Sequence, residues 1–306
     1  MRNRPGFFVA GLWLLALALG CSLHSELSLD SAHVGDGGPG GVVGAAQSAS
    51  ENPATDGGSD EFAFFRVANF SEQPALDFCI RPHDPTDSLP FETSLDSGPY
   101  FASRHIETGL PYPLSSFYIA RPPNRYDLRF VAPGSTDCST KSLGVPDVLD
   151  LPSLGPGTHW SFVVTGCSSD FAVRPYEDEI IWDGSIISLR FINVMTGASP
   201  LDFGFGAGDS FAAFFNGIGY GQFGSGPGID ALGYRHIGSV HDAATIRASE
   251  SSADLLSGQV QIDFGLAGHS ASFFAVGTLG TPRAKLIHCH DFGSIASPFA
   301  ACNAVQ

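Results

Sequence analysis

One segment near the end of the chain, His288-Cys289-His290-Asp291, is dense in potential metal ligands. Side chains alternate between the two faces of a β-strand, so His288 and His290 would share one face and Cys289 would point to the other. Two adjacent imidazoles could bind zinc or copper, but no second ligand pair stands in the sequence at the spacing of a zinc site. We therefore predict that the protein holds neither a metal ion nor another cofactor.

A second candidate for chemistry is Ser210, in the segment Gly208-Asp209-Ser210-Phe211. A serine becomes a nucleophile when a neighbouring base takes its proton, so His236 or His241 would have to lie within hydrogen-bond distance. The segment is similar to the nucleophile block of an esterase family with an α/β fold, and this chain has no helical pattern that could build such a fold. We predict no catalytic residue and no enzymatic activity, with a serine hydrolase that uses Ser210 as the alternative.

A third candidate is the glycine-dense aromatic stretch at residues 203–228. Its glycines would break any long strand, which predicts a loop. An aromatic side chain exposed on a loop is a common contact for a sugar ring or a partner protein. Tyr220 and Phe223 are the predicted ligand contacts, and the competing interpretation is that the loop covers an edge of the first half of the chain.

The N-terminus predicts export and lipid attachment. Two arginines precede an apolar run, Phe7–Gly20, which is too short to span a membrane and is typical of a signal peptide. The run ends at Leu17-Ala18-Leu19-Gly20-Cys21, which resembles the lipobox of bacterial lipoproteins. We therefore predict a signal peptide over residues 1–20 and lipidation of Cys21, which would anchor the protein in the bacterial cell envelope, in the outer membrane.

Residues 21–61 hold the predicted lipidated cysteine and a linker rich in glycine, serine, alanine and aspartate. The linker has no apolar periodicity and is predicted to be disordered. The whole chain has 15 Lys and Arg residues against 31 Asp and Glu residues, for a net charge of −16. Nucleic-acid binding needs clustered basic side chains, so this charge excludes a nucleic-acid partner.

From residue 62 onward the chain repeats itself once, with low similarity. Phe65-Arg66-Val67-Ala68-Asn69 matches Leu189-Arg190-Phe191-Ile192-Asn193, and Leu76-Asp77-Phe78 matches Leu201-Asp202-Phe203. Three further matches are Asp127-Leu128-Arg129 with Thr245-Ile246-Arg247, Gly157–Phe162 with Gly268–Phe273, and Gly166 with Gly277. The segments are short, apolar and bounded by turn residues, which predicts strands.

An all-β fold follows from this pattern. We predict two tandem immunoglobulin-like antiparallel β-sandwiches, at residues 62–175 and 177–290, with a boundary near the charged run Pro175–Glu179. Asn69 and Asp77, which recur as Asn193 and Asp202, are interpreted as groups that satisfy the backbone at strand ends.

The opening of each repeat resembles a known family. Phe65–Ser71 followed by Pro74–Phe78, and Leu189–Phe203 in the second repeat, are similar to domain of unknown function 4397. The resemblance covers residues 62 to 289. It implies secreted or surface-anchored bacterial proteins with immunoglobulin-like sandwiches, often in tandem, and it implies no known reaction.

Five cysteines remain once Cys21 is set aside, and an exported chain can oxidise them. A bridge from Cys289 to Cys302 would tie the tail, residues 291–306, to the last strand. In the first repeat Cys79 with Cys138 is the preferred pair, which would leave Cys167 unpaired. Cys138 with Cys167 is the alternative.

The function that the sequence favours is a lipid-anchored envelope protein that binds a protein or glycan ligand or serves as a surface spacer. The membrane is its predicted partner through the lipid. The alternatives are the serine hydrolase and a purely structural envelope protein.

Overall fold

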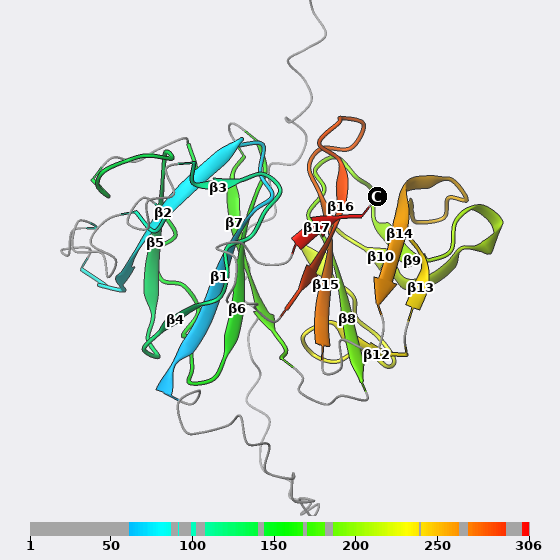
Figure 1. Cartoon of the computed structure of the whole chain (residues 1–306), viewed down its shortest axis with the longest axis horizontal. Coiled ribbons are helices and arrows are strands. Elements are labelled where there is room, and N and C mark those ends of the chain that lie inside the picture. Colours follow the sequence, from blue (N-terminus) through cyan, green and yellow to red (C-terminus); the bar gives the residue numbers. More distant parts are fainter. Residues whose placement is uncertain are drawn as a thin grey trace, which may run out of the picture. The chain divides into compact units, whose positions relative to one another are not determined.

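The computed structural model describes residues 61–86, 91, 99–101, 108–139, 144–167, 170–180, 186–238, 240–262, 269–291 and 302–305. This part of the chain forms seventeen β-strands, one short 3-10 helix, η4 (Gly208–Ser210), and no α-helix. Figure 1 shows the strands, and all of the described residues belong to one compact unit. The predicted all-β sandwich fold is confirmed.

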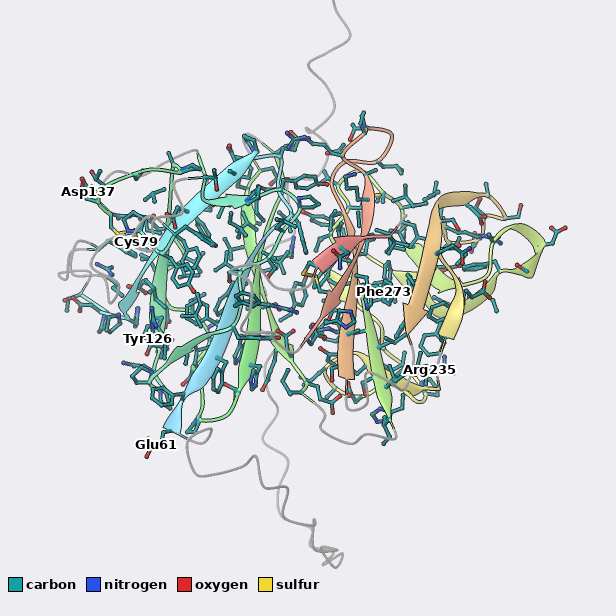
Figure 2. The ribbon with its side chains drawn as sticks, in the orientation of Figure 1. Glu61, Cys79, Tyr126, Asp137, Arg235 and Phe273 are labelled. Atoms are coloured by element: carbon teal, nitrogen blue, oxygen red, sulfur yellow. A yellow bond between two sulfur atoms is a disulfide. The ribbon has the colours of Figure 1, made fainter. Side chains whose placement is uncertain are left out.

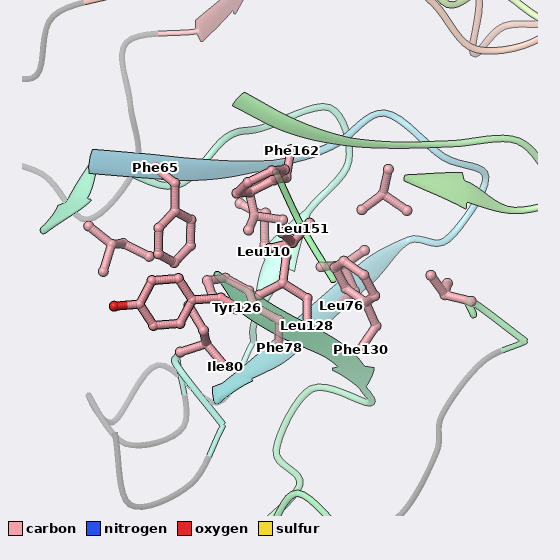
Figure 3. Close-up of a cluster of buried hydrophobic side chains, with 14 of the residues drawn as sticks. Phe65, Leu76, Phe78, Ile80, Leu110, Tyr126, Leu128, Phe130, Leu151 and Phe162 are labelled. Atoms are coloured by element: carbon pink, nitrogen blue, oxygen red, sulfur yellow. The ribbon is translucent and has the colours of Figure 1, made fainter. Parts of the chain in front are cut away.

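The first sandwich consists of two sheets with the strand orders β4-β1-β6-β7 and β3-β2-β5. Its strands are β1 (Ala63–Asn69), β2 (Ala75–Pro82), β3 (Leu110–Pro111), β4 (Ile119–Arg121), β5 (Tyr126–Val131), β6 (His159–Thr165) and β7 (Ala172–Asp178). Figure 3 shows the apolar core between the two sheets, in which Phe65, Phe78 and Phe162 are fully buried. The inward residues alternate with outward ones along each strand, as expected for a sandwich.

The second sandwich has the sheet orders β10-β9-β13-β14 and β11-β8-β15-β16-β17, with β12 also paired to β8. Its strands are β8 (Ile187–Asn193), β9 (Leu201–Phe205), β10 (Ala212–Ile218), β11 (Gln222–Phe223), β12 (Tyr234–Ile237), β13 (Val240–Ala248), β14 (Asp254–Ile262), β15 (His269–Val276), β16 (Lys285–His290) and β17 (Cys302–Ala304). Phe203 lies between Phe191 and Phe273 in its core, with ring centroids 4.9 and 4.8 Å away. Figure 2 labels Phe273 among the side chains of this sandwich.

The two sandwiches repeat the same central strand pairing. β1 pairs with β6 in parallel, with Arg66 opposite Ser161, and β8 pairs with β15 in parallel, with Arg190 opposite Ser272. All other strand pairs in the described residues are antiparallel. The matched sequence segments therefore occupy equivalent places.

Glycine recurs at one position after the second strand of this pair. Gly166 and Gly277 have φ angles of +91° and +81°, where an L side chain is strained. A Cβ atom on Gly166 would lie 1.9 Å from the Asp170 carbonyl oxygen, and one on Gly277 would lie 2.2 Å from that of Arg283. The repeat keeps glycine here because no other residue has room.

Two details of the predicted repeat need correction. In the first sandwich Phe78 pairs with Phe130, and in the second its equivalent Phe203 pairs with Ile246. The residue that corresponds to Ile246 is therefore Phe130. The predicted match of Leu128 with Ile246 is therefore two residues out. A shift of two keeps each side chain on its face, so the apolar pattern cannot reveal it.

The predicted boundary between the sandwiches is also displaced. The run Pro175–Glu179 was expected to connect them, but β7 extends to Asp178 and β8 begins at Ile187. Tyr176 is buried in an apolar cluster. The Asp178 carboxylate forms a buried ion pair with Arg190, as described below. The charge in this run therefore belongs to a strand, and the connection is residues 179–186.

A third apolar cluster lies between the sheet that contains β1 and the sheet that contains β8. Ala68 and Val163 come from the first sheet, and Ile192, Phe274 and Ile287 come from the second. Phe70 and Phe274 meet with ring centroids 5.0 Å apart. The two sandwiches therefore share a core of their own, which a pair of independent domains joined by a linker would lack.

Candidate functional site

A group of buried polar side chains lies between the two sandwiches. On β1, Phe65 and Val67 point into the first core, so the alternation of the strand turns Arg66 toward the second sandwich. Arg190 is placed in the same way on β8, between Leu189 and Phe191. Both arginines are at most 1% exposed, so each must find an anionic partner in the interior.

Arg66 finds its partners mainly in the second sandwich. Its Nη2 donates to Asp291 Oδ1 at 2.5 Å, and its Nη1 donates to the His290 carbonyl oxygen at 3.1 Å. Its Nε donates to Ser161 Oγ of the first sandwich at 2.6 Å. Arg66 therefore joins its own strand pair to the end of β16.

Arg190 makes the reciprocal set of contacts. Its Nη2 donates to Asp178 Oδ1, and its Nη1 donates to the Glu177 carbonyl oxygen at 2.6 Å, both in the first sandwich. Its Nε donates to Ser272 Oγ of its own sandwich at 3.2 Å. Each sandwich thus supplies an arginine to the other and accepts one from it.

Serine and tyrosine hydroxyls complete the coordination of both carboxylates. Asp178 Oδ2 accepts from Ser161 Oγ at 2.6 Å and from Tyr118 at 2.7 Å. Asp291 Oδ2 accepts from Ser272 Oγ at 2.8 Å and from Tyr234 at 2.9 Å. The guanidinium groups also lie over the tyrosine rings, with Arg66 5.0 Å from the Tyr118 centroid and Arg190 4.5 Å from that of Tyr234. We call these eight side chains the crossed network.

The surroundings in the crossed network fix the protonation of Tyr118, Tyr234 and Asp178. Burial raises the pKa of Tyr118 and of Tyr234 far above the ordinary value, so both phenols keep their protons and donate. Burial alone would raise the pKa of Asp178. The charges of Arg66 and Arg190, with hydrogen bonds from Ser161 and Tyr118, outweigh it and lower the pKa instead. The Asp178 carboxylate is therefore ionised at neutral pH.

We expect the stability of the protein to fall in acid because of Asp178. Its pKa is lowered in the folded state, so its contribution is present above the ordinary aspartate value of about 3.9 and is lost as the pH drops through the folded value. The urea midpoint should therefore be lower at pH 3 than at pH 7, and the difference should shrink in Asp178→Asn. A midpoint that rises in acid would contradict this assignment.

Sequence reasoning identified only part of this network. The repeat paired Arg66 with Arg190 and, within longer segments, Ser161 with Ser272. It missed the two tyrosines, and it placed Asp291 in a metal-ligand cluster and Asp178 in a linker. Strand pairing brings the tyrosines to the arginines, and the sequence does not display that pairing: Tyr234 stands opposite Arg190, and Tyr118 precedes Ile119, which stands opposite Phe65.

The recurring asparagine and aspartate residues serve the backbone, as interpreted from the sequence. Asn69 Nδ2 donates to the Leu110 carbonyl oxygen at 3.1 Å, and Asn193 Nδ2 donates to that of Ile218 at 3.0 Å. Asp77 Oδ1 accepts the backbone N–H groups of Phe78 and Phe101 at 2.7 and 2.8 Å. Asp202 Oδ1 accepts from the Gly217 N–H at 2.8 Å and from Ser249 Oγ at 2.7 Å.

Tyr220 and Phe223, the predicted ligand contacts, lie against the first sandwich. The Tyr220 hydroxyl donates to Thr165 Oγ1 at 3.3 Å, and the Arg174 guanidinium lies 4.8 Å from the Tyr220 ring centroid. Phe223 packs edge-on against Tyr176, and both rings are partly or fully buried. The prediction that residues 203–228 form a loop is wrong, because the stretch holds the end of β9, η4, β10 and β11, with Tyr220 between β10 and β11 and Phe223 in β11. The contacts of Tyr220 and Phe223 favour the competing interpretation, in which this stretch covers the edge strand β7.

The described hydrogen bonds of Ser210 lie within its own turn. Its Oγ donates to the Ala207 carbonyl oxygen at 2.8 Å and accepts from the Ala207 N–H at 3.1 Å. His236, one of the two predicted bases, contacts Ser188 Oγ through Nδ1 at 2.7 Å instead. The predicted pair of Ser210 with His236 is therefore wrong. The side chain of His241, the other predicted base, lies outside the described part of the structure.

His288 and His290 share one face of β16, as predicted from strand alternation. Their ring centroids are 4.6 Å apart, and His288 stacks on Phe273 at 4.6 Å. Burial and the neighbouring His290 lower the pKa of His288 to about 3, so this imidazole is neutral at physiological pH. Among the described residues, no three His, Cys, Asp or Glu side chains are close enough together to hold a metal ion.

Two disulfides join described cysteines, in the two pairings preferred from the sequence. Cys79 is bonded to Cys138, and Cys289 is bonded to Cys302, which holds β17 on β16. Cys167 is disulfide-bonded as well, so the expectation that it stays unpaired is wrong, and so is its alternative pairing with Cys138. The expectation followed from setting Cys21 aside, which left an odd number of cysteines.

The predicted signal peptide, the lipidated Cys21 and nearly all of the linker at residues 21–61 lie outside the described residues. No helix in the described ranges combines the length and the apolar character that crossing a membrane requires.

Comparison with known proteins does not assign a family. No protein-family model matches the chain, and no curated protein matches it. One solved structure that matches is described as "Alpha-glucan binding by a streptococcal virulence factor". It is 11% identical, the match covers 69% of this chain and 92% of that one, and the TM-score of 0.19 is too low to support a conclusion about this chain.

Proposed function

We propose that the chain is an exported protein of the bacterial cell envelope, anchored by a lipid on Cys21, which acts as a binding protein or surface spacer. The disulfides Cys79–Cys138 and Cys289–Cys302 support export, because such bonds persist in oxidising compartments. The lipobox-like segment that ends at Cys21 supports the anchor.

The observation that carries the non-catalytic part of this proposal is how the polar side chains are used. Ser210 bonds only to the backbone in its described contacts, and the buried arginines and aspartates between the sandwiches are paired with one another. A catalytic site needs a nucleophile or base that is free to meet a substrate. Ester hydrolysis that disappears in Ser210→Ala would contradict this part.

A spacer role is supported by the way in which the sandwiches are joined. The shared apolar cluster and the crossed network leave little freedom for hinge motion between them. Such a body on the flexible linker predicted at residues 21–61 would hold a protein or glycan ligand at a distance from the membrane. Binding of the purified protein on a glycan array, or in a pull-down from envelope extract, would separate binding from a purely structural role.

We also propose that each sandwich is a copy of domain of unknown function 4397. The arginine and the asparagine of the motif that suggested this resemblance make corresponding contacts in both sandwiches, and the aspartate accepts a backbone N–H in each. A motif that is needed for folding would recur in this way without any shared ligand.

Anchoring is tested by Cys21→Ser, because the lipid is attached through the Cys21 sulfur. We expect the parent protein to enter the detergent phase and the variant to stay in the aqueous phase or to keep its signal peptide. Equal partitioning of the parent and a variant that has lost its signal peptide would contradict the anchor. Mass spectrometry of the N-terminal peptide provides a second readout. Cys167 is disulfide-bonded, and Cys21 is the one cysteine of the sequence outside the Cys79–Cys138 and Cys289–Cys302 bonds, so a lipid on Cys21 and a bond from Cys21 to Cys167 exclude each other. A peptide with lipid on Cys21 supports the anchor, and a peptide linked to Cys167 contradicts it.

A further inference from the structure

The contacts between the two sandwiches are related by an approximate two-fold symmetry. Arg66 and Arg190 are equivalent, because each stands opposite an equivalent serine in a parallel strand pair. Asp178 and Asp291 are equivalent too. Asp178 pairs with His159, and the Asp291 N–H donates to the Ser270 carbonyl oxygen. His159 and Ser270 each stand two residues before the equivalent serines Ser161 and Ser272.

A second reciprocal pair lies away from the crossed network. The equivalent residues Asn69 and Asn193 donate hydrogen bonds to the carbonyl oxygens of Leu110 and Ile218. Tyr112 and Tyr220 each follow these carbonyl residues by two positions, so the two tyrosines are equivalent as well. Arg283 of the second sandwich lies 5.4 Å from the Tyr112 ring centroid, and Arg174 of the first lies 4.8 Å from that of Tyr220. Equivalent tyrosines thus contact arginines of the opposite sandwich.

We infer that the two sandwiches carry the same self-complementary recognition surface, and that the partner this surface fits is another sandwich of its own kind. In a two-fold pair every contact occurs twice, with residue i on residue j and j on i. The crossed ion pairs meet this requirement, since Arg66 binds Asp291 and Arg190 binds Asp178. Two copies of the first sandwich could therefore pair through Arg66 and Asp178.

Charge supports the same partner. Each surface buries one cation and one anion, so two identical surfaces remain neutral when the arginine of each meets the aspartate of the other. A partner of one charge sign would leave one of these buried groups unpaired, which is costly. The apolar cluster around the network is supplied by both sandwiches in the same way.

The test begins with the folded full-length protein, cut once at a protease site engineered between Asp178 and Ile187. We expect the two halves to stay together after the cut. After separation in denaturant and refolding, native mass spectrometry should find three species: first with second, first with first, and second with second. Halves that part on cutting, or that re-form only the mixed pair, would overturn the inference.

A matched variant tests whether the crossed network makes these pairs. Arg66→Met with Asp291→Asn leaves the mixed pair one ion pair, Arg190 with Asp178. It leaves the pair of first halves and the pair of second halves with none. Like pairs should therefore fall at least about tenfold relative to the mixed pair, whereas exposed Arg125→Ala should leave the ratio unchanged. Like pairs that are equally abundant in the network variant would overturn the assignment of the surface.

A measurement on the uncut chain keeps the inference falsifiable if the halves aggregate. Two-fold symmetry requires equivalent residues to contribute alike, so Arg66→Met and Arg190→Met should lower the urea midpoint by similar amounts. A large loss in one and none in the other would show that the surfaces are not equivalent.

Discussion

Replacing Asp178 by alanine is expected to lower the free energy of unfolding by about 3–5 kcal/mol, the usual cost of removing one partner of a buried ion pair. Asp178 accepts hydrogen bonds from Arg190, Ser161 and Tyr118, and Arg66 lies 3.7 Å away. Without the carboxylate, Arg190 would stay buried without the anion that its Nη2 now contacts. The urea unfolding curve, followed by circular dichroism, measures the loss.

The control for this experiment is Arg125→Ala. Arg125 also pairs with an aspartate, Asp150, but the two side chains are 52% and 40% exposed. Exposed pairs contribute at most about 1 kcal/mol, so this variant should unfold close to the parent. If Asp178→Ala costs no more than Arg125→Ala, the crossed network is not what holds the sandwiches together.

Removing the Cys79–Cys138 disulfide should cost about 4 kcal/mol, because the bond closes a loop between residues 59 positions apart and restricts the unfolded chain. Both sulfurs are buried with Phe91, whose ring lies 4.2 Å from the guanidinium groups of Arg81 and Arg129. The double variant Cys79→Ala with Cys138→Ala, unfolded in urea without reductant, measures the effect.

The second disulfide provides the comparison. Cys289 and Cys302 are 13 positions apart, so the loop model gives a smaller loss of about 3 kcal/mol for Cys289→Ala with Cys302→Ala. The order of the two losses is the informative result. If the shorter loop costs more, the packing of β17 on β16, and not loop closure, dominates the stabilisation.

The sequence predicted what depends on local pattern. Alternation along Phe65, Arg66 and Val67 is enough to place Arg66 on the face opposite its two neighbours, and alternation along β16 indicated that His288 and His290 share a face. Glycine at 166 and 277 marked equivalent turns. Each of these features is set by neighbours along the chain and by the period of a strand, which a single sequence displays directly.

The crossed network could not be predicted, because its contacts join residues that are far apart in the sequence. Nothing near Arg66 in the sequence points to Asp291, because their contact requires two sheets to pack face to face. The same limit explains Tyr220: a glycine-rich aromatic stretch can bind a ligand or cover β7, and only the positions of Arg174 and Thr165 favour covering. Charged side chains in an apparent linker, such as Asp178, can likewise be interior groups once a partner arrives from another sheet.

Differential scanning calorimetry of the intact chain tests most directly whether the two sandwiches are one body. The shared core and crossed ion pairs predict a single unfolding transition, with a calorimetric enthalpy equal to the van't Hoff enthalpy. In Asp178→Ala this transition should move to lower temperature as a whole or divide into two. Two separate transitions in the parent protein, one for each sandwich, would contradict the account.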